Sequence, residues 1–151
     1  MQVYADNAAT TRMSDKAVAA MLPYFQTYYG NPSSLHTVGQ QAAEALADAR
    51  RRVADCLGCS FKEITFTSGG SEADNQAIVS AARIGERKGK KHIISTAFEH
   101  HAVLHTLKKL EKEGFEVTLL DVGPTGTITP QQVAEAIREA CLDALGRVVH
   151  A

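Results

Sequence analysis

Apolar residues along the 151-residue chain change their spacing several times, from helical spacing to short continuous runs. In residues 38–57 they recur every three or four positions, which predicts a long amphipathic helix. The same spacing predicts helices over residues 14–27, 71–87, 100–113 and 129–144. Short β-branched and aromatic runs predict strands over residues 64–67, 92–95 and 115–120. Because strands and helices alternate, we expect an α/β fold with a mostly parallel sheet and flanking helices.

Residues that start or stop helices refine these boundaries. Ser14 is a capping residue for the first helix, and Pro23 is expected to kink or interrupt that helix. Gly58 is expected to end the helix over 38–57. Ser71 reads as the cap of the next helix, with Asp74 three positions on as a capping-box variant.

Composition places the chain among ordinary globular proteins, with 44% hydrophobic and 22% charged residues. The formal net charge of −1 gives no electrostatic reason to expect nucleic acid or an anionic membrane as partner. We find no apolar run of membrane-spanning length and no secretory signal in the first residues. Three cysteines without such a signal suggest reduced thiols. We therefore expect a cytoplasmic protein.

The glycine turn at residues 68–71, Ser-Gly-Gly-Ser, lies between a predicted strand and a predicted helix. Free amides in the first turn of a helix, together with the helix dipole, form a ready site for an anion. A P-loop would need Gly-Lys-Ser/Thr, and a dinucleotide fingerprint would need a third glycine where Asn75 and Gln76 stand. Two interpretations stay open: a single phosphate binds here, or the glycines serve only the geometry of the turn.

Two histidines, His100 and His101, follow the predicted strand over 92–95, at a sheet edge where ligands gather. A neutral imidazole there could stack on a planar cofactor and exchange protons, or it could be an ordinary exposed or satisfied histidine. His101 and His105 share a helix face and could bind a metal. Because the sequence has no HExxH pattern and no obvious third ligand, we expect no metal site.

Cys56 and Cys59 form a CxxC pattern, which can indicate redox chemistry or half of a zinc site. However, Cys56 stands at the end of a helix rather than before one, and no second CxxC exists. We interpret these cysteines as structural or incidental.

Four segments, taken in order and at their separations, carry a family resemblance. They are residues 4–11, 30–36, 66–75 and 99–104. The set resembles the N-terminal portion of cysteine desulfurases, the NifS- and IscS-like members of the class V aminotransferase family. The likeness runs from about Val3 to about Ala140.

The resemblance implies a fold type I enzyme that depends on pyridoxal 5'-phosphate. Such enzymes convert L-cysteine to L-alanine and leave a persulfide sulfur for iron–sulfur cluster or thio-cofactor assembly. It further implies a sulfur-acceptor protein as a possible partner and a homodimer as the oligomeric state.

Site residues carry over by position. Gly70 and Ser71 match the pair that holds the cofactor phosphate, and the change from the family's Ala-Thr to Gly-Ser keeps the amides and a hydroxyl. His100 matches the histidine that stacks over the pyridine ring and assists proton transfer. Four further residues match loops at the substrate mouth: Asn7, Ala8, Thr10 and Asn31.

The sequence also departs from the family pattern. None of the eight lysines lies in the Ser-x-His-Lys segment that holds the cofactor in the family, and none of the three cysteines matches the persulfide cysteine. Residues 141–151 differ from the apolar strand of the family. We therefore expect a truncated chain that forms one partial domain over 1–151. Its parts are an arm, helix and substrate-mouth loop (1–35), a large-domain portion (36–140) and a divergent tail (141–151).

Three readings remain. The first is a desulfurase-like chain without turnover by itself, so that whether it acts as an enzyme stays open. The second is a non-enzymatic fragment that at most binds the cofactor non-covalently or joins a complete homologous subunit. The third is another class V enzyme, such as a selenocysteine lyase. The segments over 6–11 and 30–34 favour the desulfurase branch.

Overall fold

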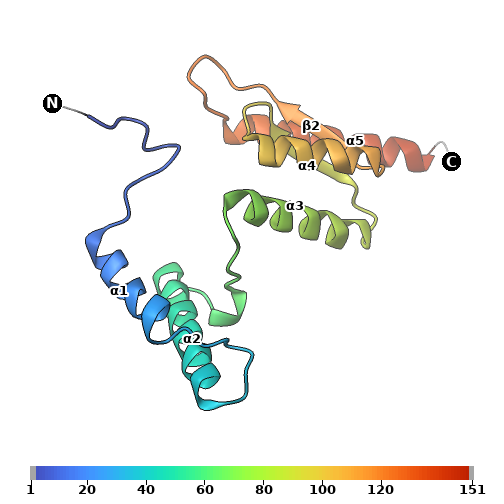
Figure 1. Cartoon of the computed structure of the whole chain (residues 1–151). Helices are drawn as coiled ribbons and strands as arrows, with labels where there is room; N and C mark the ends of the chain where they lie inside the picture. The colour runs from blue at the N-terminus through green and yellow to red at the C-terminus, as the bar shows by residue number, and fades with distance from the viewer. Residues whose placement is uncertain (1–2, 150–151) are drawn as a thin grey trace. The chain divides into compact units, whose positions relative to one another are not determined.

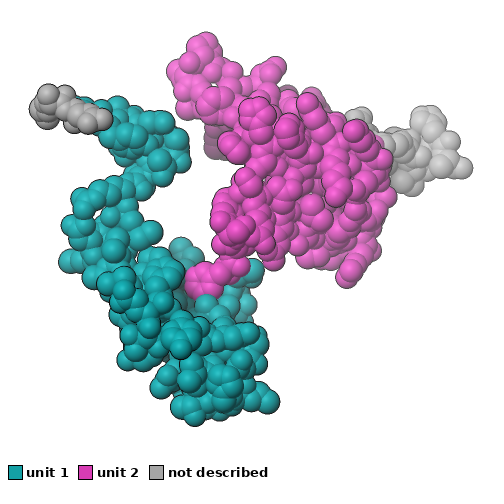
Figure 2. All heavy atoms as spheres, in the orientation of Figure 1, with its two compact units in different colours: residues 1–65 teal, residues 66–151 magenta. Residues whose placement is uncertain are grey.

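The computed structural model describes residues 3–149, with side chains as far as Leu142. The chain divides into two compact units, residues 1–65 and 66–151 (Figure 2). The sequence pattern predicts a first boundary after residue 35, whereas the compact units divide after residue 65. A single partial domain over 1–151 stays a prediction.

The first unit is helical. It contains α1 (Asp15–Gln26), α2 (Thr37–Leu57) and the short 3-10 helix η1 (Phe61–Glu63), as Figure 1 shows. The Ser14 hydroxyl accepts a hydrogen bond from Ala17 N at 3.2 Å, so the predicted cap is confirmed.

Proline does not interrupt α1, so that part of the expectation was wrong. The helix continues through Pro23 to Gln26. Pro23 lacks an amide hydrogen, but its carbonyl still accepts from the amides of Thr27 and Tyr28, at 2.8 and 2.9 Å. Because only the amide hydrogen is missing, the helix loses one bond at Pro23, and the Pro23 carbonyl still closes the last turn.

Gly58 ends α2 as predicted, in the left-handed conformation with φ +68°. The amide of Gly58 donates to Asp55 O, and the amide of Cys59 donates to Ala54 O. These two bonds form a Schellman motif, which satisfies carbonyls that would otherwise be left open at the helix end.

The second unit is a βαβ arrangement with additional helices. Its elements are α3 (Gly70–Glu86), β1 (His92–Thr96), α4 (His101–Lys112), β2 (Glu116–Leu120) and α5 (Pro130–Val149). β1 and β2 pair in parallel, from His92 opposite Glu116 to Thr96 opposite Leu120. α3 packs on α4, and α5 contacts both strands. The predicted α/β class with a parallel sheet is thereby confirmed.

The strand expected at residues 64–67 was wrong. In the part of the chain that the structure describes, the ladder of hydrogen bonds joins β1 and β2 only, and residues 64–67 form no strand. The β-branched and aromatic composition of this run indicates suitability for a pleated surface, but it cannot supply a neighbouring strand. The run also contains the boundary between the two units, after Thr65.

The core of the second unit lies between α3, α4 and the sheet. It is formed by Ala82, Leu110 and Phe115, with Ile78 and Ile93 packed against it. Leu110 is 1% exposed, so its side chain is enclosed on all sides. Among the described residues, no helix is both long and apolar enough to cross a membrane.

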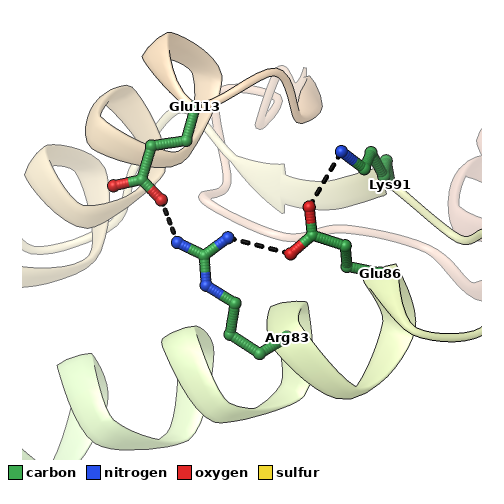
Figure 3. A network of polar contacts seen from close by, with 4 residues as sticks. All are labelled: Arg83, Glu86, Lys91 and Glu113. Carbon is green, nitrogen blue, oxygen red and sulfur yellow. Dashed lines mark hydrogen bonds and ion pairs between the residues drawn. The ribbon is translucent and has the colours of Figure 1, made fainter.

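An ion-pair cluster lies beside this core and consists of Arg83, Glu86, Lys91 and Glu113 (Figure 3). Arg83 pairs with Glu86 at 3.0 Å and also with Glu113, while Lys91 pairs with Glu86 at 2.8 Å. Both cations lie 5.6 Å from the centre of the Phe115 ring. The cluster therefore ties the end of α3 to the end of α4 and to the residue before β1.

Truncation of the core leucine should destabilise the second unit. We expect Leu110→Ala to lower the free energy of unfolding by about 3 kcal/mol, because it leaves a cavity in an enclosed site. Urea unfolding followed by circular dichroism measures the change. The matched control is Leu142→Ala, since Leu142 is 66% exposed. Equal losses in the two variants would contradict the assignment of the core.

The ion-pair cluster should make the stability of the second unit depend on pH in the acidic range. Hydrogen bonds from Lys91 and then Arg83 lower the pKa of Glu86 below its ordinary value of 4.5. A carboxylate with a lowered folded pKa contributes stability that is present above 4.5 and is lost as the pH falls through the folded value. We expect Glu86→Gln to remove part of the drop in melting temperature between pH 6 and pH 3. Glu139→Gln, which removes a carboxylate on α5, should leave that drop unchanged.

Candidate functional site

The N-terminus of α3 has no side-chain cap, so the prediction of Ser71 as cap with Asp74 was wrong. The cap position is Gly69, which carries no side chain, and Ser71 lies inside the helix. The carboxylate of Glu72 instead turns back and accepts from the amide and the hydroxyl of Ser68, at 2.6 and 2.7 Å. These bonds, the hydroxyl first, lower the pKa of Glu72, so the carboxylate holds the turn in its ionised form.

Backbone amides at this end of α3 precede the first helical hydrogen bond. That bond runs from Ala73 N to Gly69 O at 3.1 Å. The amides of Gly70, Ser71 and Glu72 are therefore the groups that a helix leaves for a partner outside itself. They carry the positive end of the helix dipole.

Two of four glycines at turns and helix starts are required by packing, and the other two are not. A Cβ on Gly30 would lie 2.3 Å from Val38 O, and one on Gly39 would lie 2.3 Å from Ser34 O, so both are required for packing. A Cβ on Gly69 or Gly70 would meet no described atom within 4 Å. Gly69 has an extended backbone with φ 167°, which any residue adopts. Within the described chain, neither packing nor strain explains these two glycines.

His100 is the N-cap of α4. Its Nδ1 accepts a hydrogen bond from Ala102 N at 3.1 Å. A ring that accepts at Nδ1 carries its proton on Nε2 when it is neutral. The backbone therefore fixes both the tautomer and the position of the ring.

A hollow of about 460 Å³ brings Ser71 and His100 together. α3 contributes Ser71 and Asn75 to its lining, and α4 contributes Thr106, His105 and Lys109, the last two exposed. The described side chains that line the hollow include no aspartate or glutamate. Such a lining suits an anionic ligand.

The histidine rings continue along α4. His101 lies edge-on to His100 with ring centres 6.0 Å apart, and edge-on to His105 at 5.6 Å. Over the described residues, no group of three or more His, Cys, Asp or Glu side chains could hold a metal ion. The pair His101 and His105 thus has no third ligand of these types there.

The four predicted substrate-mouth residues belong to the first unit. Asn7, Ala8 and Thr10 lie in an exposed turn in which the amides of Ala9 and Thr10 donate to Asp6 O. The Tyr4 hydroxyl closes the turn through Asp6 O at 3.0 Å and Thr10 O at 3.2 Å.

Asn31 holds a second exposed turn, where its Oδ1 accepts from Ser33 N at 2.9 Å. Ser71 and His100 belong to the second unit. That the four substrate-mouth residues of the first unit lie at the same site as Ser71 and His100 therefore stays a prediction.

The cysteines Cys56, Cys59 and Cys141 are free thiols. In the Schellman motif at the end of α2, Cys59 is the residue after Gly58, a position that usually packs against the helix near Ala54 rather than near Cys56. This geometry agrees with the interpretation of the CxxC pattern as incidental.

Sequence reasoning missed a polar link between the two helices of the hollow. Asn75 on α3 hydrogen-bonds to Ala102 O and to the hydroxyl of Thr106, both on α4. In the sequence, Asn75 belongs to the segment 66–75 of the family resemblance and stands where a dinucleotide fingerprint would need a glycine, and neither pattern predicts a contact with α4. The one available signal for this link was Thr106, a polar residue within the apolar stripe of the helix over 100–113.

Residues 3–143 match the family described as aminotransferase class-V. The chain belongs to the aminotransferase class-V family. Enzymes of this family are generally dependent on pyridoxal phosphate.

Two similar relatives carry the name cysteine desulfurase. Putative cysteine desulfurase IscS 1 of Bacillus subtilis (strain 168) is 45% identical over 138 residues, which cover 91% of this chain and 36% of that protein. Cysteine desulfurase IscS of Methanosarcina thermophila is 49% identical over 137 residues, which cover 91% and 34%. The predicted resemblance to cysteine desulfurases is confirmed, and the chain spans about a third of the length of these relatives.

Two solved structures share the fold of this chain. A NifS-like protein superposes with a TM-score of 0.83 at 38% identity, over 89% of this chain and 37% of that one. SspA in complex with cysteine superposes with a TM-score of 0.79 at 39% identity, over 87% and 38%. These superpositions confirm the prediction that the chain forms part of a fold type I large domain.

The cap role of His100 can be separated from any ligand role. We expect His100→Ala to lower the free energy of unfolding by about 1 kcal/mol, because α4 loses its N-cap. His100→Asn should retain that stability, since asparagine is a strong capping residue. Urea unfolding measures both variants. His105→Ala, which alters an exposed histidine away from the cap, is the control, and a fully stable His100→Ala variant would rule the cap role out.

Proposed function

We propose that this chain carries the phosphate-binding turn and the ring-stacking histidine of a cysteine desulfurase that depends on pyridoxal 5'-phosphate. The observation that carries the proposal is the hollow shared by Ser71, at the open end of α3, and His100, the cap of α4. The desulfurase relatives support the same assignment.

The residues of the hollow fit the cofactor in size and charge. A volume of about 460 Å³ lies in the range of small-molecule sites. The amides of Gly70 and Ser71 and the Ser71 hydroxyl would hold the phosphate, since a single phosphate matches one helix N-terminus. The ring of His100 would lie against the pyridine. When bound, the cofactor supplies an electron sink for breaking bonds at the substrate's α-carbon.

His100 contributes a defined proton position. Its Nδ1 is committed to Ala102 N, so the proton of the neutral ring is at Nε2. In this tautomer Nε2 can donate a hydrogen bond to a bound group, but it has no lone pair with which to take a proton. As a catalytic residue, His100 is therefore assigned the donation of a hydrogen bond at Nε2 to the reacting group. Passing a proton at Nε2 would require the ring to give up its bond from Ala102 N.

The substrate that we propose is L-cysteine, which would be converted to L-alanine with its sulfur passed on as a persulfide. The names of the relatives and the cysteine complex of SspA support this choice. Asn7, Ala8, Thr10 and Asn31 would lie at the substrate mouth. We further propose a sulfur-acceptor protein as partner, a homodimer and a cytoplasmic location, the last in keeping with the three free thiols.

Cofactor binding by these 151 residues should be non-covalent. None of the eight lysines lies in a Ser-x-His-Lys segment, so no residue matches the family's cofactor lysine. Borohydride treatment of the cofactor-loaded chain should therefore label no single lysine stoichiometrically, Lys109 of the hollow included, and sulfide release from L-cysteine should be absent.

The phosphate contact can be tested directly. We expect Ser71→Ala to weaken pyridoxal phosphate binding roughly tenfold to a hundredfold, since it removes a hydrogen bond to a charged group. Gly70→Ala should bind like the wild type, because an added Cβ meets no described atom there and the amide stays. Fluorescence titration with pyridoxal phosphate gives the affinities.

Ser80→Ala, the same change at an exposed position of α3 outside the hollow, is the matched control. If pyridoxal phosphate fails to bind the folded wild-type chain, or binds Ser71→Ala equally well, the proposed function is wrong.

A further inference from the structure

We infer that Asn75 and Thr106 form a positioning pair, which fixes the turn that carries Ser71 relative to the turn that carries His100. The inference deepens the proposed function and rests on it for the identity of the ligand. The juxtaposition of the two turns follows from contacts within the chain itself.

Asn75 makes three hydrogen bonds, one within α3 and two to α4. Its Nδ2 donates to Ser71 O on α3 at 2.7 Å and to Ala102 O on α4 at 3.3 Å. Its Oδ1 accepts from the Thr106 hydroxyl at 2.5 Å. One side chain thus contacts the first turn of α3 and the first two turns of α4.

The orientation of the Asn75 amide follows from these partners. If the amide were turned over, Oδ1 would face two carbonyl oxygens, those of Ser71 and Ala102, and no hydrogen bond could form there. The Thr106 hydroxyl has one proton, which lies within reach of both Asn75 Oδ1 and Ala102 O, the latter at 2.8 Å. The hydroxyl therefore makes a bifurcated hydrogen bond, shared between Asn75 Oδ1 and Ala102 O.

Burial fixes one side of the link. Thr106 is 4% exposed and is followed on α4 by the buried Leu107. Its hydroxyl is therefore held beside its two acceptors, Asn75 Oδ1 and Ala102 O. Asn75 itself is exposed, so its side chain is positioned by these hydrogen bonds rather than by burial.

The bonds form a continuous path between the two site residues. The Ala102 amide donates to His100 Nδ1, and the Ala102 carbonyl accepts from Asn75. Asn75 donates in turn to the carbonyl of Ser71. The Thr106 hydroxyl donates to two members of this path, Asn75 Oδ1 and Ala102 O. A change at Thr106 should therefore affect both the phosphate turn and the imidazole, even though neither is altered in sequence. Preformed placement of this kind is what a ligand-binding site requires of its supporting residues.

The test compares two variants of Thr106 in the full chain, of which the valine is isosteric with threonine. Thr106→Val removes the hydroxyl and should weaken pyridoxal phosphate binding about tenfold, whereas Thr106→Ser keeps the hydroxyl and should bind like the wild type. The matched control is Thr118→Val. Its hydroxyl bonds to His92 Nε2 at 2.8 Å between β1 and β2, and it lies outside the hollow. That variant should lose stability without losing affinity.

Two additions keep the result decisive. Asn75→Ala provides a second break at an exposed position, and combining it with Thr106→Val should weaken binding no further than Asn75→Ala does, because both remove one network. Backbone order parameters from NMR of the unliganded chain should fall at Ser71 and Ala102 in Thr106→Val and stay unchanged in Thr118→Val.

The outcomes separate the two proposals. Wild-type affinity in Thr106→Val and Asn75→Ala, or an equal loss in Thr118→Val, would overturn the positioning pair. If the wild-type chain fails to bind pyridoxal phosphate, the proposed function falls, and the order parameters alone decide the pair. Unchanged order at Ser71 in Thr106→Val would then overturn it.

Discussion

The packing of α3 against α4 is the constraint on which the second unit depends. Leu110 and Phe115 fill the space between these helices and the sheet, and the ion-pair cluster around Arg83 joins their far ends. At the near ends, the hydrogen bonds of Asn75 join the opening turns. Apolar burial supplies the attraction between the helices, but it is non-directional, so the polar contacts at both ends are what define their register.

This arrangement explains how a common α/β unit can present a specific site. Ser71 and His100 are 29 positions apart in the sequence, yet each stands at the start of a helix, and both helices start on the same side of the packed pair. Functional groups at helix starts also have backbone amides as neighbours. The site therefore combines side chains with backbone in a way that suits an anionic ligand.

Much of the fold could be predicted from the sequence because local signals agreed with the tertiary structure. Ser14 and Gly58 act at the helix ends where their chemistry places them, and the runs over 92–95 and 115–120 pair as expected. The failures arose where the local signal was incomplete. Residues 64–67 have strand composition, but pairing depends on a second strand, and Ser71 reads as a cap although Gly69 occupies that position. The link through Asn75 is invisible to periodicity, since it depends on how two helices are docked.

Imidazole as a helix cap has a consequence of its own. His100 begins α4 and His36 begins α2 in the same way, each by accepting a backbone amide at Nδ1. A hydroxyl cap has one polar atom, which the backbone occupies, whereas an imidazole that accepts at Nδ1 has a second polar atom, Nε2, on the same ring. In each unit, therefore, the residue that begins a helix also holds a further hydrogen-bonding atom close to the backbone, which a serine in the same position would lack.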